Sequence, residues 1–167
     1  MTSVIKSIAL VSTLVVGMVG VGQANASTIT LPRAVTGSVV VKQSIQIPCG
    51  FTGTLRQETS GPLAGSLVIA NPVFNTSNGG NILCGGAVKP NAGPWVVTGV
   101  TLTGTHTGVP VGINGVGAST VLGGSCVGNI TGTLNDTGAT HTLTIPGPQT
   151  LPGTPSTCQI IGGSFTF

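Results

Sequence analysis

Glycine and proline are spread so densely through this chain that little room is left for helix. The 167 residues include 28 Gly and 11 Pro. After residue 26, no stretch of twelve residues free of both shows an apolar period of 3.6 residues. Because these two residues are the weakest helix formers, the chain is expected to be all-β.

Alternating apolar and polar residues mark the expected strands. Over 38–49, valines and isoleucines alternate with polar side chains, which is the pattern of a half-buried strand, and 139–145 repeats it. Other strands are expected near 51–57, 65–70, 95–103, 127–134 and 158–167. Short strands separated by Asn-Gly, Gly-Gly and Pro-Gly turn signals predict an antiparallel β-sandwich or barrel-like sandwich.

The first 26 residues are typical of a secretory signal peptide. Lys6 precedes an uncharged apolar run from Ile8 to Val21, which is too short to span a membrane as a helix, and a small-residue site follows it. We therefore expect cleavage between Ala26 and Ser27. The signal helix is then removed, and a single all-β domain over 27–167, with no transmembrane span, is exported to the medium, the cell surface or the periplasm.

The four cysteines are expected to form two disulfides. An even number in an exported chain favours disulfides, and no C-x2-C pair points to zinc. A weak internal repeat covers 45–90 and 122–167, in which a cysteine precedes a TGTL strand and a second cysteine closes the unit. This repeat favours bonds within each unit, Cys49 to Cys84 and Cys126 to Cys158.

Residues that carry out catalysis are scarce. The chain has five Lys+Arg, two Asp+Glu and two His, and its small, scattered net charge is not a nucleic-acid footprint. One hypothesis pairs His141 with Asp136 and a nearby Ser or Thr nucleophile, but no G-x-S-x-G elbow accompanies His141 or His106. His141 shares a strand face with Leu143 and Ile145, so we expect a structural, hydrogen-bonded ring.

The two acidic residues offer a second hypothesis for catalysis. Glu58 and Asp136 each follow a TGTL segment. They could form a general acid and base pair, or they could be turn residues on separate hairpins. The matching positions favour turns. We therefore expect no enzyme activity, no catalytic residue, no metal site and no cofactor.

The aromatic residues leave two questions open. Trp95, the single tryptophan, is either a core side chain or an exposed aromatic. The strand that ends at Phe167 is similar to the last strand of outer-membrane barrels, but the aromatic girdles of such barrels are missing from this sequence. It is also similar to the terminal strand of fimbrial subunits that exchange strands with their neighbours. A polymerising extracellular matrix or fimbrial subunit therefore stays an alternative.

The order of these features resembles the protein activator of alkane oxidation (PraB-like) family of small secreted bacterial proteins. The resemblance is carried by VxxxxxIxIPC ending at Cys49, by TGTL, by a Gly-rich approach to Cys84, by Gly93-Pro94-Trp95, and by the pair Cys126 and Cys158. It implies a non-enzymatic accessory protein that assists growth on alkanes, through surface activity at hydrophobic interfaces or in biofilm. The implied partners are a hydrophobic substrate or interface, or other extracellular proteins including further copies of this chain.

Overall fold

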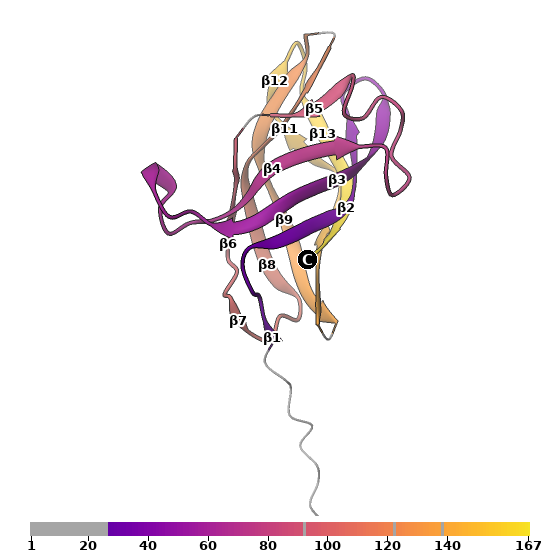
Figure 1. Ribbon diagram of the computed structural model, residues 1–167. Coiled ribbons are helices and arrows are strands. Elements are labelled where there is room, and N and C mark those ends of the chain that lie inside the picture. Colours follow the sequence, from indigo (N-terminus) through magenta and orange to yellow (C-terminus); the bar gives the residue numbers. More distant parts are fainter. Residues whose placement is uncertain (1–26, 92, 122, 138) are drawn as a thin grey trace, which may run out of the picture.

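The computed structural model describes residues 27–91, 93–121, 123–137 and 139–167 (Figure 1). The predicted signal peptide, Ala26 included, lies outside the described residues. Within them, no helix is long and apolar enough to cross a membrane. The elements are β1 (Ser27–Thr28), β2 (Arg33–Lys42), β3 (Gln46–Gln57), the 3-10 turn η1 (Gly61–Leu63), β4 (Leu67–Asn75), β5 (Val88–Pro90), β6 (Trp95–Thr98), β7 (Thr103–Gly104), β8 (Val109–Thr120), β9 (Ser125–Thr137), β10 (Thr140–Ile145), β11 (Gln149–Leu151), β12 (Gly153–Thr154) and β13 (Cys158–Thr166).

Eight of these strands close into an antiparallel barrel. Their order is β9-β10-β13-β2-β3-β4-β6-β8, and β8 pairs again with β9 to complete the circuit. The fold is thus all-β and antiparallel, as predicted, and the expected β-sandwich or barrel-like sandwich is specifically a closed barrel. An eight-stranded barrel has an interior that side chains can fill or that can hold one small ligand.

Short strands extend the two ends of the barrel. At one end β5 pairs with β8, β11 with β13 and β12 with β9. At the other end β1 pairs with β7 as a separate two-stranded sheet. Figure 1 shows β5, β11 and β12 at the top and β1 and β7 at the bottom.

An aromatic cluster occupies part of the barrel interior. The rings of Phe51 and Trp95 are stacked with their centroids 5.2 Å apart, and Phe165 lies 4.7 Å from Phe51 on another side. Trp95 is 2% exposed, and its indole Nε1 donates to Asn91 Oδ1 over 2.9 Å. Trp95 is therefore a core residue, and its polar atom has a partner.

Two of the expected strands end earlier than the sequence pattern suggests. Segment 38–49 is a hairpin, with β2 ending at Lys42 and β3 starting at Gln46, and Ile45 in the turn is 61% exposed. Segment 95–103 breaks after Thr98, because Gly99 adopts a positive φ of 82°. Across the first turn Val41, Ile45 and Ile47 keep the same apolar alternation, so periodicity did not reveal that turn.

The strand β8 was not expected, because its sequence VPVGINGVGAST is rich in glycine. Pairing on both sides, with β6 and with β9, stabilises it despite weak local propensity.

In β9, Gly132 makes space for neighbouring side chains, since a Cβ there would lie 2.7 Å from Ile145 Cδ1 and 2.8 Å from Leu143 Cδ1.

Two disulfides are present in the described chain. Cys49 in β3 bonds to Cys84 in the loop before β5, and Cys126 in β9 bonds to Cys158 in β13. The pairing is the one that the repeat favours. The second bond ties together two strands that flank β10 in the sheet order, beyond the point where β10 ends.

Candidate functional site

A cavity of about 520 Å³ lies at the end of the barrel that carries β5, β11 and β12. Its volume is within the range of small-molecule sites, and barrel mouths are a common place for them. The lining is mostly apolar and includes Val41, Phe74, Val116, Ala118, Leu151 and Ile160. An apolar wall of this kind binds by removing hydrocarbon from water.

Disulfides hold the wall of this cavity. Cys126 and Cys158 are both lining residues, and the Cys84 bond anchors the loop that supplies Leu83 and Ala87. Ile45, in the turn between β2 and β3, completes the opposite part of the wall.

The mouth of the cavity combines exposed apolar side chains with a few polar ones. Ile45 is 61% exposed, Val121 70% and Leu83 38%, and all three line the cavity. Gln43 Nε2 donates to the Ser156 carbonyl over 3.1 Å, which joins the β2–β3 turn to the segment before β13. The apolar wall is therefore continuous with an apolar rim.

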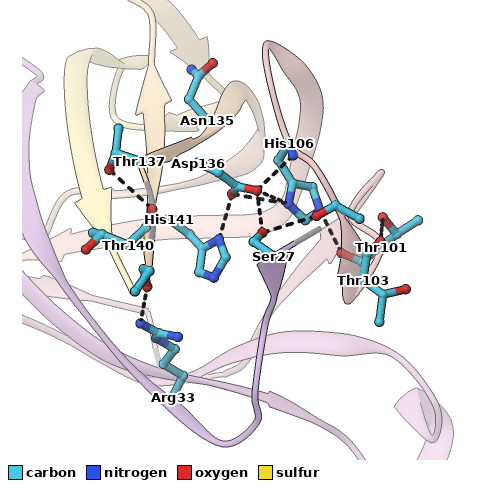
Figure 2. A network of polar contacts seen from close by, with 12 residues as sticks. Ser27, Arg33, Thr101, Thr103, His106, Asn135, Asp136, Thr137, Thr140 and His141 are labelled. Atoms are coloured by element: carbon cyan, nitrogen blue, oxygen red, sulfur yellow. Dashed lines mark hydrogen bonds and ion pairs between the residues drawn. The ribbon is translucent and has the colours of Figure 1, made fainter. Parts of the chain in front are cut away.

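A buried polar cluster lies at the other end of the barrel, around Asp136 (Figure 2). His141 Nδ1 is 2.7 Å from Asp136 Oδ1, and His106 Nδ1 is 3.0 Å from Asp136 Oδ2. The same Oδ2 accepts the His106 backbone N–H at 2.9 Å and a hydrogen bond from the Ser27 hydroxyl. Phe167 stacks on His141 with centroids 5.5 Å apart.

The carboxylate at the centre of this cluster is ionised. Burial opposes ionisation of Asp136, but hydrogen bonds from Ser27, from the His106 backbone and from the two histidine side chains outweigh it and hold the pKa of Asp136 well below its usual range.

Ring nitrogens of the two histidines face oxygen acceptors. His106 Nε2 lies 2.9 Å from the Thr101 carbonyl, and His106 Nδ1 lies 3.0 Å from Asp136 Oδ2. His141 makes its contact by donating from Nδ1 to Asp136.

The cluster does not have the geometry of a hydrolase triad. In a triad the histidine lies between nucleophile and carboxylate, whereas here Ser27 donates directly to Asp136 and to no histidine. The ligand atoms of His106, Asp136 and His141 lie within 4.8 Å of one another, a donor set that suits a transition metal. Both carboxylate oxygens already accept protein hydrogen bonds, so a hydrogen-bond network accounts for the arrangement.

Glu58 lies apart from both sites. It follows the end of β3, where a turn residue was expected, and its carboxylate pairs with Arg56 at 2.7 Å. Asp136, in contrast, is not a turn residue: it lies within β9, opposite His141 of β10. The expectation of a turn was wrong because the position after TGTL does not reveal where a strand ends. Strand β9 continues past Asp136 to Thr137, whereas β3 ends at Gln57, before Glu58.

A comparison with protein families shows which family this chain belongs to. The model of the alkane oxidation protein activators, PraA/PraB-like, matches residues 1–167. The chain belongs to this PraA/PraB-like family. No curated protein and no solved structure matches it. The sequence of this PraA/PraB-like protein did not predict the cavity, because its lining residues come from seven separate stretches of chain. The one sequence feature that relates to the cavity is the apolar alternation that includes Ile45, a residue that the fold leaves exposed at the cavity mouth.

Proposed function

We propose that this PraA/PraB-like protein is an exported, non-enzymatic accessory factor of alkane oxidation that binds the apolar part of one molecule in the cavity at the barrel mouth. The observation that carries the proposal is the cavity of about 520 Å³ with its apolar wall. A closed barrel with one apolar opening can take up hydrocarbon without unfolding. The family description names alkane oxidation, which fits a hydrocarbon ligand.

Export is part of the proposal. It is supported by the predicted signal peptide and by two disulfides, which persist mainly in oxidising compartments. Cell fractionation with and without an alkane as carbon source tests it. Protein that stays in the cytoplasm under both conditions would contradict export.

Action at a hydrophobic interface is also proposed, because the cavity rim is apolar. Ile45 and Val121 extend into solvent beside the cavity, and only 4% of the residues are charged. We expect the protein to lower pendant-drop tension at an alkane–water interface more than an equal mass of an ordinary globular protein. The double variant Ile45→Ser, Val121→Ser should lose this excess. In a biofilm, the same rim would contact apolar matrix or cell surfaces.

The alternative role, a polymerising matrix or fimbrial subunit, depends on free strand edges. Each of the eight barrel strands pairs on both sides, which removes the edges on which such pairing would build. The geometry therefore favours binding over polymerisation. Size-exclusion chromatography and electron microscopy of the purified protein test this alternative, and cross-β fibres would support it.

The binding experiment uses the intrinsic fluorescence of the protein. Trp95 is the single tryptophan and the chain has no tyrosine, while Phe74 lines the cavity and its ring centroid is 6.4 Å from that of Trp95. Titration with 1-alkanols of increasing length should give Kd values that fall about fourfold per methylene, since each buried methylene contributes about 0.8 kcal/mol. The trend should stop when the cavity is full.

A matched pair of variants separates cavity binding from general stickiness. Ala118→Phe adds a ring to the cavity wall and should weaken the longest alkanols most, whereas Ala64→Phe adds the same ring at an exposed position outside the cavity. Equal binding by both variants, or no dependence on chain length, would contradict the proposal.

A further inference from the structure

Lys42 is the one charged side chain among the described residues that line the cavity at the barrel mouth. It is the last residue of β2 and is half-buried there, opposite Gln46 of β3 and Gln159 of β13. A lysine in such a place lays its methylene stem along the apolar wall and keeps its ammonium group in water at the rim.

No carboxylate side chain among the described residues is available to that ammonium group. The chain has two acidic residues in total, and Glu58 pairs with Arg56 at 2.7 Å. Asp136 is held by Ser27 and the two histidines at the other end of the barrel. Asp136 lies ten positions along β9 from Cys126 of the cavity wall, a distance of about 33 Å along an extended strand.

The last described residue, Phe167, is also distant from Lys42, because it stacks on His141 and pairs with that residue through its backbone. Lys42 is therefore a cation at the edge of an apolar cavity, and no side chain of the described residues supplies its counter-charge.

We propose that the preferred occupant of this cavity is a fatty acid, whose hydrocarbon chain fills the apolar interior and whose carboxylate pairs with Lys42. The inference rests on the proposed function and adds the chemical class of the ligand. An alkane would use the apolar wall and leave Lys42 without a partner. A fatty acid uses both, and a charge-assisted hydrogen bond to a carboxylate is stronger than one between neutral groups.

The test compares three ligands of one chain length, dodecanoate, 1-dodecanol and dodecane, by Trp95 fluorescence at pH 8. We expect dodecanoate to bind about three- to tenfold more tightly than the alcohol, the range of a partly exposed ion pair with a charge-assisted hydrogen bond. Lys42→Gln, which keeps a similar stem without the charge, should remove this preference by weakening dodecanoate binding several-fold more than dodecanol or dodecane binding. Lys42→Arg should retain it, and Lys42→Glu should reverse it.

Lys89→Gln is the matched control. Lys89 is exposed in β5 and lines a separate outer hollow with Arg56 and Glu58, so its loss removes one positive charge without touching the cavity. Raised salt should weaken dodecanoate but not dodecanol.

The outcomes separate this inference from the proposed function. Equal affinity for dodecanoate and dodecanol in the unaltered protein, or an equal loss of dodecanoate binding in Lys42→Gln and Lys89→Gln, would overturn the fatty-acid assignment while alcohol binding still supports an apolar site. Failure of all three ligands to bind would overturn the proposed function itself.

Discussion

Ser27 donates a hydrogen bond from its hydroxyl to Asp136 Oδ2, across 109 positions of sequence. This contact joins β1 to β9 at the end of the barrel opposite the cavity. If export cleaves the chain after Ala26, as predicted, the first residue of the mature protein is the one that holds its buried carboxylate. The lower end of the barrel is therefore stabilised by the start of the domain, and the upper end by two disulfides.

Replacing the carboxylate should destabilise the protein strongly. Asp136→Asn replaces the carboxylate that accepts hydrogen bonds from Ser27, His106 and His141, and the new amide N–H₂ faces these donors. Each buried donor left without its acceptor typically costs about 1–3 kcal/mol, so we expect a loss of about 3 kcal/mol or more in urea denaturation. Glu58→Gln, which breaks the exposed pair with Arg56, is the control and should change stability by less than about 1 kcal/mol. Similar losses in both variants would contradict the central role of Asp136.

The low pKa of Asp136 predicts a dependence of stability on pH. A carboxyl group whose pKa is lower in the folded state stabilises the protein above its unfolded pKa of about 4, and this contribution is lost as pH falls. We expect the free energy of unfolding to decrease from pH 6 towards pH 2. Asp136→Asn should show a much flatter profile over the same range. Parallel profiles for the two proteins would show that other groups cause the acid sensitivity.

The hydroxyl of Ser27 should matter more than that of its neighbour. Ser27→Ala removes one donor from Asp136, and hydrogen bonds to charged groups contribute about 1.5–3 kcal/mol. Thr28→Ala, at an exposed position of the same strand, is the matched control and should have little effect. Thermal unfolding of the 27–167 domain measures both, and equal melting temperatures would contradict a stabilising contact.

The disulfides should support both stability and the cavity. A Cys49→Ser, Cys84→Ser double variant should lose about 2–5 kcal/mol, the usual range for small exported domains, and should appear at lower abundance outside the cell. Because Leu83 is next to Cys84 in sequence, Val88 forms a β-bridge with Cys84, and both line the cavity, alkanol binding should weaken as well. Non-reducing peptide mapping checks the pairing, and a bond between Cys49 and Cys158 would contradict this structure.

The histidine cluster shows how little of the site could be predicted from sequence. The alternation of His141 with Leu143 and Ile145 indicated a buried, hydrogen-bonded ring, and the ring is 1% exposed with Asp136 as its partner. His106 gave no such pattern, because it lies in a loop between β7 and β8 and meets Asp136 only through the fold. Local periodicity reports which face a strand residue occupies, but it carries no information on loop residues.

The sequence by itself determined the all-β class, because dense glycine and proline exclude helix and apolar residues alternate with a period of two. It also indicated the cysteine pairing, because the internal repeat places two cysteines in each of its two units. Only the tertiary structure decided that β8 meets β9, which turns a sheet into a closed barrel with a cavity at one mouth. The physical reason is that closure and cavity depend on which distant strands pair and how their side chains fill the space between them. Those contacts join residues far apart in the chain, and no local pattern encodes them.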